Sequence, residues 1–373
     1  MDTKYSFVKS EIKSKILQGN ILPHQKIGSE ADLMKEYSVS RHTVRKAIGD
    51  LVVEGWIYKK QGAGTFCADR SSALQQQEKR TKNIAVITTY FSDYIFPAII
   101  RGAQSFLSEH GYQVTVFSTN NDHEQERRCL EDVLSQQFDG LIVEPTKSSQ
   151  PNPNINYYLN IERFGIPYVM IHAYYEELEP IHIVMDDEEG GRQQTAHLIE
   201  QGHRHILGFF KNDDIQGKLR TKGFIKAHRE AGLTLSPQNI INYSTETMGE
   251  IPRQILRERL SGNGERPTAI VCYNDQLAIG LLDVLREREL SIPEDISIVG
   301  FDNSFLSIAS EVKLTTIVHP QEEMGIQAAK TLHQVIKNKE VPTGEVKIPS
   351  ITYKPTLKVR SSTRSIEVSP AVK

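Results

Sequence analysis

Donor-rich side chains gather at residues 41–45, where the chain reads RHTVR. Arg41, His42 and Arg45 would lie near the N-terminus of a helix, on the side opposite to its apolar residues. Guanidinium and imidazole groups placed there can donate hydrogen bonds to base edges and phosphates in the major groove of duplex DNA. The pattern therefore predicts a recognition helix. The alternative is a small helical domain with a solvated basic face.

Capping residues and apolar spacing predict the elements that position this stretch. Ser29, followed three residues later by Asp32, is typical of a helix start, and Ser40 is typical of a second one. Residues 56–58 and 65–66 predict a β-hairpin that can lie beside the neighbouring groove as a wing. The second helix would bury one face, and a further helix upstream would close the core with another: Val44, Ala47, Ile48, Leu51 and Val52 in the former, and Tyr5, Val8, Ile12 and Ile16 in the latter.

Together these features resemble the winged helix of GntR-type repressors. The family signature combines a Ser-Glu helix start, a V-S-R-x-T-V-R recognition helix and a G-x-G-T-F wing, which correspond to residues 29–30, 39–45 and 62–66. Gly28 stands where the family usually has proline, which loosens the helix entry but removes no contact group. Lys4 is expected on phosphate and Gln61 at the wing tip. The expected DNA-binding residues are Lys4, Glu30, Arg41, His42, Thr43, Arg45, Gln61 and Gly62.

The distribution of charge agrees with a nucleic-acid-binding head on a body that does not touch DNA. Residues 1–68 hold 11 Lys and Arg against 7 Asp and Glu, a net charge of +4. Because the whole chain has a formal net charge of −3, the remainder carries −7. The cysteines, Cys67, Cys129 and Cys272, form no C-x-x-C pair, so we expect buried free thiols rather than disulfides or a metal site.

A polar stretch at residues 69–82, DRSSALQQQEKRTK, is almost free of large apolar groups and predicts a domain boundary. The expected domains are a winged helix-turn-helix at 1–68, a linker at 69–82 and an effector-binding and dimerisation domain at 83–373. The chain start has no apolar core of a signal peptide, and no run approaches the ~20 apolar residues of a membrane helix. We therefore expect a soluble, cytoplasmic protein.

Short apolar runs alternate with helical stretches from residue 83 onward. They occur at 83–89, 113–118, 140–145, 166–172, 205–210, 268–274 and 296–302. Uniformly apolar strands separated by helices predict parallel sheets that are covered on both faces, which is an α/β fold. About 290 residues is long for one doubly wound sheet, so two lobes are expected.

Polar side chains that follow these strands are candidates for a ligand site, because open α/β sheets bind ligands beyond the carboxyl ends of their strands. The candidates combine carboxylates, cations, a histidine and a tyrosine, a mixture that suits sugar hydroxyls. Each has a plainer interpretation: Asp275 and Asp302 as helix caps, Arg220 as a surface residue, His172 as a satisfied core histidine. The full set is Tyr94, Glu144, Lys147, His172, Arg220, Asp275 and Asp302.

Residues 83 to about 360 resemble the effector domain of the LacI/GalR family, which shares its two-lobed fold with periplasmic sugar-binding proteins. The matching motifs are the Arg-x-x-Gly-Phe at 220–224, Asn-Asp at 274–275, IPEDISIVGFDN at 292–303 and LTTI at 314–317. The resemblance implies sugar contacts from Arg220, Asp275 and Asp302. It also implies a first lobe of residues 83–185 and 317–345, with 314–317 in a crossover between lobes.

The pairing of a GntR-type head with a LacI/GalR-type body is similar to the arabinose repressors of Gram-positive bacteria, as are the segments 90–102 and 119–128. This resemblance alone implies L-arabinose as the effector; composition and spacing do not choose among monosaccharides. It implies a homodimer that binds double-stranded operator DNA and is released by sugar. A repressor that answers another sugar, and one for which sugar is a co-repressor, remain open.

Other classes of protein fit the sequence less well. A transport binding protein would need no DNA-binding head. An aminotransferase-like body would be longer and would need a lysine for pyridoxal phosphate. No G-x-S-x-G nucleophile elbow and no G-x-x-x-x-G-K phosphate loop occurs. We therefore expect no enzyme, no cofactor and no metal.

Overall fold

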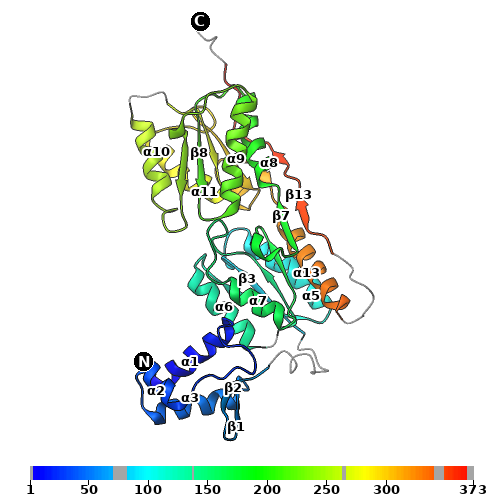
Figure 1. The fold of residues 1–373 in the computed structure, drawn as a ribbon. Helices are drawn as coiled ribbons and strands as arrows, with labels where there is room; N and C mark the ends of the chain where they lie inside the picture. The colour runs from blue at the N-terminus through cyan, green and yellow to red at the C-terminus, as the bar shows by residue number, and fades with distance from the viewer. Residues whose placement is uncertain (1–2, 70–81, 137, 263–265, 340–347, 368–373) are drawn as a thin grey trace.

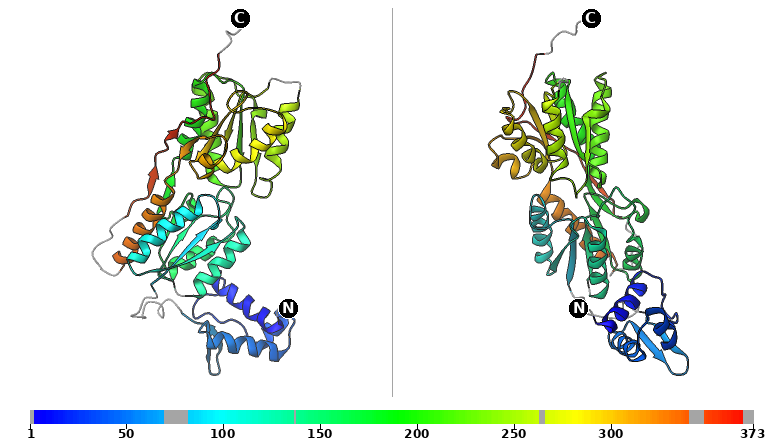
Figure 2. Two further views of the ribbon diagram at one scale, coloured as in Figure 1. Left: turned by 180° about the vertical axis from the view of Figure 1, so that it is seen from behind. Right: turned by 90° about the vertical axis from the view of Figure 1, so that its left-hand side faces the viewer.

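The computed structural model describes residues 3–69, 82–136, 138–262, 266–339 and 348–367. A small head and two α/β lobes follow one another along the length of the molecule (Figure 1), and the same order is seen from behind and from the side (Figure 2). The structure confirms the predicted fold class. Most of the predicted linker, residues 70–81, lies outside the described residues, and the domain boundaries remain a prediction.

The head has the predicted three helices and hairpin. They are α1 (Lys4–Leu17), α2 (Glu30–Tyr37), α3 (Arg41–Val53) and the antiparallel strands β1 (Ile57–Lys60) and β2 (Gly64–Cys67). Ser29 and Asp32 form a capping box at the start of α2, and the Ser40 side chain accepts a hydrogen bond from the backbone N–H of Thr43 at the start of α3. Local sequence signals therefore fix where both helices begin.

The first lobe is a six-stranded sheet between two pairs of helices. Its strand order is β13-β7-β6-β5-β3-β4, and all neighbours are parallel. The strands are β3 (Asn83–Thr88), β4 (Gln113–Ser118), β5 (Gly140–Val143), β6 (Tyr168–Ile171), β7 (His182–Met185) and β13 (Ile351–Tyr353). The helices α5 (Phe96–Glu109) and α13 (Gln321–Asn338) cover one face, and α6 (His123–Ser135) and α7 (Ile155–Arg163) cover the other. The short helix η1 (Glu176–Leu178) follows β6.

The second lobe repeats this design. Its sheet has the order β14-β12-β11-β10-β8-β9, and only β14 runs antiparallel to its neighbour. The strands are β8 (Ile206–Lys211), β9 (Ile240–Tyr243), β10 (Ala269–Cys272), β11 (Ser297–Asp302), β12 (Thr315–Val318) and β14 (Leu357–Lys358). The helices are α8 (Asp187–Glu200) and α9 (Ile215–Glu230) on one face, and α10 (Ile251–Ser261) and α11 (Asp275–Glu287) on the other, with η2 (Pro237–Asn239) and α12 (Leu306–Ala309) as short connectors.

Three segments cross between the lobes, and here the structure corrects the predicted lobe boundaries. The LTTI stretch is not a crossover, because residues 315–318 form β12 inside the second sheet. The crossovers connect β7 to α8, β12 to α13 and β13 to β14. Residues 351–353, assigned from the sequence to the second lobe, form an edge strand of the first. A short apolar strand fits either sheet, so its composition does not reveal which one it joins.

The seven predicted strands are present, whereas the internal strands β7 and β12 and the edge strands β9, β13 and β14 were not predicted. These are short, and β9, for example, reads IINY without a continuous apolar run. The three cysteines are buried and free, as predicted.

The head packs directly on the first lobe through the end of α1. The Tyr157 hydroxyl on α7 donates to Glu131 on α6 at 2.9 Å and accepts from Gln18 Nε2 at 3.1 Å. Asn160 Nδ2 donates to the backbone oxygen of Leu17. Buried apolar residues of the head, α6 and α7 form one continuous cluster, so the contact is a packed interface as well as a polar one.

Candidate functional site

The start of α3 and the tip of the hairpin lie at the end of the head that faces away from the lobes (Figure 1). Arg41 and Arg45 are largely exposed, with side-chain exposures of 65% and 60%. Both guanidinium groups donate to the same carboxylate on α2, Arg41 Nε to Glu30 Oε2 at 2.9 Å and Arg45 Nε to Glu30 Oε1 at 3.0 Å. These two hydrogen bonds lower the pKa of Glu30. Glu30 thus holds two exposed arginines side by side.

The remaining head residues predicted to bind DNA also lie on the surface. Lys4 is exposed at the first turn of α1, and His42 is exposed at the start of α3. Gln61 and Gly62 are exposed in the turn between β1 and β2, where Gly62 has a φ of 73° that favours glycine. Thr43 is partly buried and its hydroxyl hydrogen-bonds with that of Ser40 at 2.8 Å.

A cavity of about 260 Å³ lies between the lobes. Side chains from both lobes line it, many of them from segments that follow strands and others, such as Arg220 of α9, from helices. Of the predicted effector residues, it brings together Tyr94, Glu144, His172, Arg220 and Asp302. Further polar lining groups that the sequence analysis missed are Asn121, Asp187, Lys211, Asp214, Gln216 and His319.

Arg220 is held rigidly at the floor of the cavity. Its Nε donates to Asp187 Oδ1 at 2.8 Å, and its Nη1 donates to the backbone oxygen of Tyr273 at 2.6 Å. The guanidinium lies 3.5 Å from the ring centroid of Phe301, a cation–π arrangement. Burial raises the pKa of Asp187 to about 6, although Arg220 acts in the opposite direction.

Close packing of α8 on α9 brings Asp187 and Arg220 together. A Cβ atom on Gly191 would lie 2.4 Å from the backbone oxygen of Arg220, and one on Gly223 would lie 2.1 Å from that of Glu188. Only glycine at these two positions lets the helices approach so closely. The two glycines therefore allow the ion pair between Asp187 and Arg220 to form, although neither glycine belongs to the pair.

Asp302 and Tyr94 meet across the cavity from opposite lobes. The Tyr94 hydroxyl donates to Asp302 Oδ2 at 2.5 Å and accepts from the backbone N–H of Asp275 at 3.2 Å. Tyr94 has a φ of 60° and Asp302 a φ of 96°, backbone conformations that L-residues adopt only at a cost. Burial raises the pKa of Asp302, and Arg220 opposes this shift. Strained backbone at both positions thus accompanies their side-chain contact across the cavity.

Glu144 and His172 of the first lobe form a polar wall together with His319 of the crossover from β12 to α13. Glu144 Oε2 accepts from the backbone N–H and the hydroxyl of Thr89, both at 2.7 Å, and Glu144 Oε1 lies 2.9 Å from His172 Nδ1. Within the described part of the chain, His172 Nε2 and both ring nitrogens of His319 have no hydrogen-bond partner. Both imidazoles are almost completely buried, so these nitrogens are available to a ligand in the cavity.

The two histidines differ in charge preference. Burial alone would lower the pKa of His172, but the hydrogen bond and the charge of Glu144 outweigh it and raise that pKa. Burial, together with the positive groups His172 and Arg220, lowers the pKa of His319 well below its usual value. The wall therefore offers two imidazoles with opposite tendencies: proton binding is favoured at His172 and disfavoured at His319.

Two residues predicted to contact effector do not line the cavity. Asp275 is fully buried, and its carboxylate accepts from Thr316 Oγ1 at 2.6 Å and from the Ser304 backbone N–H at 2.7 Å. It therefore braces the segment after β11 that carries Asp302, and the helix cap is Asn274 rather than Asp275. Lys147, whose φ is 42°, points along the cleft mouth, where its Nζ lies 2.6 Å from Glu246 Oε1.

The missed lining residues obey the same strand-end rule as the predicted ones. Asp187 follows β7, His319 follows β12, and Lys211 ends β8 just before Asp214. Neither β7 nor β12 was predicted as a strand, which explains why Asp187 and His319 were missed. Asn121, Lys211 and Asp214 follow strands that were predicted, so for these three the position after a strand did not show which side chains turn into the cavity.

A winged head and a two-lobed body with a polar cavity define a DNA-binding regulator with the architecture of a ligand-binding protein. Residues 4–67 match the family described as bacterial regulatory proteins, gntR family, and residues 195–363 match the periplasmic binding protein-like domain.

Full-length relatives narrow this class. The chain is 64% identical over 364 residues to the arabinose metabolism transcriptional repressor of Halalkalibacterium halodurans, covering 97% of each chain. It is 49% identical to the protein of the same name from Geobacillus stearothermophilus, covering 97% of this chain and 98% of that one. The chain belongs to this family of transcriptional repressors, which are regulators and not enzymes.

Solved structures support the fold. The cellobiose complex of the transcriptional regulator CelR is 23% identical, covers 87% of this chain and 91% of its own, and superimposes with a TM-score of 0.65. At this level of identity the likeness concerns the fold alone. Among the described residues, none of the helices has the length and apolar composition needed to span a bilayer.

Proposed function

We propose that the cavity between the lobes binds L-arabinose and that the bound sugar releases the repressor from its operator. The observation that carries this proposal is the set of buried polar groups without partners, His172 Nε2 and both nitrogens of His319, that line the cavity between the lobes. Sugar hydroxyls both donate and accept hydrogen bonds, so they match neutral and charged groups together. The names of the two full-length relatives support arabinose as the sugar.

Each side chain has a role in this proposal. Arg220 donates to hydroxyls from the second lobe, and Asp302 and Glu144 accept from them on opposite sides of the cavity. Tyr94 orients Asp302. His172 from the first lobe and His319 from the crossover add hydrogen bonds, and the rings of Tyr90 and Phe96, which also line the cavity, can pack on C–H faces of the sugar.

Sugar that touches both lobes favours the closed arrangement of the cleft. A ligand shifts a conformational equilibrium by its differential affinity for the two states. In a homodimer, closure rotates one lobe relative to the partner subunit. The two heads then no longer match both half-sites of the operator. Linkage requires that operator DNA weakens sugar binding by the same factor.

A homodimer is part of this proposal. A single winged helix reads only a few base pairs, and two half-sites give a repressor useful specificity. The exposed cluster of Arg41, His42 and Arg45 would read one half-site, with Gln61 and Gly62 of the wing beside it and Lys4 on phosphate. Sedimentation of the full chain with and without operator measures this directly, and a monomer at micromolar concentration in both samples contradicts it.

The decisive experiment compares wild type with Asp302→Ala in an operator gel shift titrated with L-arabinose. We expect the variant to bind operator as wild type does and to stay bound at sugar concentrations that release wild type. Glu294→Ala, an exposed residue of the same lobe, is the matched control and is expected to behave as wild type. Release of Asp302→Ala at the wild-type concentration would refute the site.

Two other outcomes would change the proposal in a defined way. Tighter operator binding on addition of sugar would make the effector a co-repressor. Calorimetric titration of the full chain with a panel of pentoses and hexoses would identify a different effector, if one binds more tightly than L-arabinose.

A further inference from the structure

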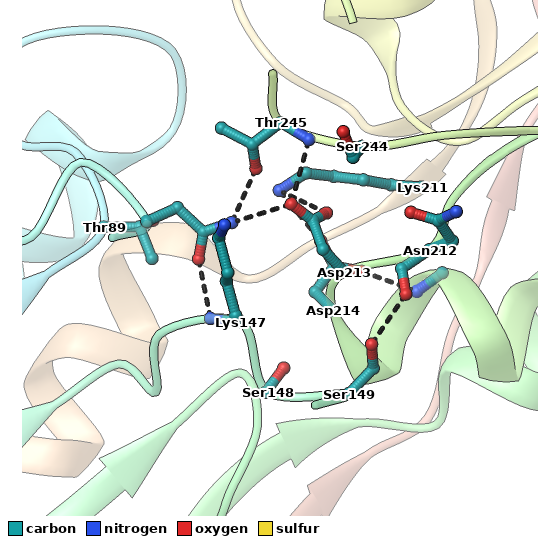
Figure 3. Close-up of polar contacts among 12 residues, drawn as sticks. Thr89, Lys147, Ser148, Ser149, Lys211, Asn212, Asp213, Asp214, Ser244 and Thr245 are labelled. Carbon is teal, nitrogen blue, oxygen red and sulfur yellow. Dashed lines mark hydrogen bonds and ion pairs between the residues drawn. The ribbon is translucent and has the colours of Figure 1, made fainter. Parts of the chain in front are cut away.

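A second polar region joins the two lobes, and it extends from the cavity wall at Asn121 to the surface. The three crossovers leave the sheets at the β7–β13 edge of the first lobe and the β12–β14 edge of the second. The polar contacts lie at the opposite edges, beyond the ends of β4, β5, β8 and β9 (Figure 3). Opening about the crossovers would separate the side remote from them most, so contacts there would be lost first.

Asn121 is the buried centre of this region. It is 2% exposed and follows β4 in the first lobe. Its Nδ2 donates across the cleft to Thr245 Oγ1 at 2.6 Å and to Asp213 Oδ2 at 3.3 Å. Its Oδ1 accepts from the backbone N–H of Lys147 at 2.7 Å. One amide side chain therefore ties a first-lobe turn to two loops of the second lobe.

Lys147 and Glu246 add an ion pair at the surface. Lys147 Nζ lies 2.6 Å from Glu246 Oε1, and the hydrogen bond from Lys147 lowers the pKa of Glu246 to about 2. The side chain of Lys147 is 19% exposed and that of Glu246 is 59% exposed. This pair is in reach of solvent, so a change there alters the contact between lobes with little effect on either core.

The next two residues of the same turn hold the start of α9. Ser148 Oγ accepts from the backbone N–H of Ile215 at 3.0 Å, and Ser149 Oγ donates to the backbone oxygen of Asn212 at 2.7 Å. Helix α9 carries Arg220 into the cavity five residues after Ile215. The turn at 147–149 thus contacts the start of the helix that positions Arg220 (Figure 3), and none of its three residues is part of the cavity lining.

We infer that Asn121 and the turn 147–149 of the first lobe form a latch with residues 212–213 and 245–246 of the second, and that this latch sets the sugar sensitivity of the repressor by stabilising the closed cleft. Asn121 borders the cavity, whereas the other members lie outside its lining and act as positioning residues. The inference rests on the proposed function, because it describes how the same cleft is regulated. It assigns Lys147 to the lobe contact, whereas the sequence suggested a contact to effector.

The size of the effect follows from the kind of contact. The apparent dissociation constant of a ligand rises as the fraction of binding-competent protein falls. A partly exposed ion pair and one cross-lobe amide hydrogen bond are each modest contributions, so loss of either should weaken sugar binding about three- to tenfold. The affinity for operator in the absence of sugar should not fall.

A charge swap tests the latch in the full-length protein. Lys147→Glu and Glu246→Lys each place like charges together at the lobe contact, and the double variant restores an opposite-charge pair. We expect each single variant to raise the calorimetric dissociation constant for L-arabinose about three- to tenfold, and the double variant to return it towards the wild-type value. Thr245→Val, which removes the acceptor for Asn121 at constant size, should weaken binding similarly.

Glu287→Lys is the matched control. Glu287 pairs with Arg257 inside the second lobe, with 49% exposure and a distance of 2.7 Å, so the same charge reversal leaves the lobe contact intact. It should change neither sugar affinity nor shape. Wild-type sugar affinity in both single variants, or a double variant no better than the singles, overturns the latch. The second result is also the one expected if Lys147 bound sugar directly.

Small-angle scattering without sugar tests the latch independently of the identity of the effector. We expect a larger radius of gyration for both single variants than for wild type and Glu287→Lys, and a wild-type value for the double variant. A flat sugar titration of wild type would reject the proposed effector, whereas the scattering comparison would still decide the latch. Identical scattering from all variants would overturn it.

Discussion

The head and the body both pair arginine with a carboxylate, but under opposite conditions. In the head, Arg41 and Arg45 share Glu30 at the surface, with side chains more than half exposed. In the body, Arg220 and Asp187 form a pair with 5% and 3% exposure, closed by helices that touch at glycines. An exposed pair is screened and worth little, whereas a buried pair is costly to break.

This difference fits what each region has to recognise. In the proposed DNA complex, a phosphate or guanine would replace the Glu30 contact at little cost, because water already surrounds the arginines. The cavity arginine is held in place before any ligand arrives, so a sugar meets donors whose geometry is already fixed. An exposed arginine pair can exchange one partner for another, and a buried pair holds the arginine in a fixed geometry.

Breaking the buried pair should have the largest effect. Arg220→Met leaves Asp187 without its counter-charge, which typically costs about 3–5 kcal/mol. We expect a lower free energy of unfolding for the body, measured in urea, and loss of sugar binding by calorimetry. The double variant Arg220→Met/Asp187→Asn should recover much of the stability and none of the sugar binding. Equal stability of the two variants would contradict the role of charge burial.

Removing one exposed arginine should affect DNA binding alone. A bidentate arginine contact to guanine contributes about 1–3 kcal/mol of discrimination. We therefore expect Arg41→Ala to weaken specific operator binding roughly fivefold to more than a hundredfold, with sugar affinity and stability unchanged. Lys222→Ala removes one positive charge from the body and is the control. Wild-type operator affinity for Arg41→Ala would remove this residue from the interface.

The pH dependence of stability should come from the body. Burial, with the charge of Asp302 as the next contribution, raises the pKa of Asp275 to about 7 from a reference value of 3.8. The folded body therefore binds a proton there that the unfolded chain has released, and the free energy of unfolding falls as pH rises through 5 to 7. Urea unfolding of Asp275→Asn should depend on pH less steeply than that of wild type. An unchanged slope would show that Asp275 is ionised throughout.

Glu30→Ala separates the two functions of the exposed pair. Without Glu30, Arg41 and Arg45 are no longer held together, and the head has one negative charge fewer. Specific operator binding should weaken by about 1 kcal/mol as orientation is lost, while binding to unrelated DNA strengthens. A nitrocellulose filter assay on both DNAs gives the ratio. A parallel change on both would mean that Glu30 acts only as a charge.

Lys4→Ala should give the smallest change. A lysine on phosphate binds every sequence alike, and its removal lowers the slope of log K against log salt by about one unit. The specificity ratio should stay constant. An unaltered salt slope would place Lys4 away from the backbone of DNA.

The sequence was most informative where structure is local. Ser29, Asp32 and Ser40 mark the starts of α2 and α3 because capping depends on residues three positions apart. A cavity residue that follows a strand could be predicted only if the strand itself was predicted. Asp302 after β11 was therefore identified, and His319 after β12 was missed. Asp275 and Lys147 were assigned to the sugar because a strand-end position says nothing about which way a side chain turns, and here tertiary contacts turn both away.

Because Tyr157 and Asn160 hold the end of α1, we expect the head and the first lobe to move as one body. The chain then has two moving parts instead of three, and closing the cleft turns the second lobe without altering the angle between the head and the first. A lone protomer would look the same to DNA with its cleft open or shut. Closure would change operator affinity only in a dimer, where it alters the position of one head relative to the other. The repressor would therefore respond to sugar through the geometry between two chains.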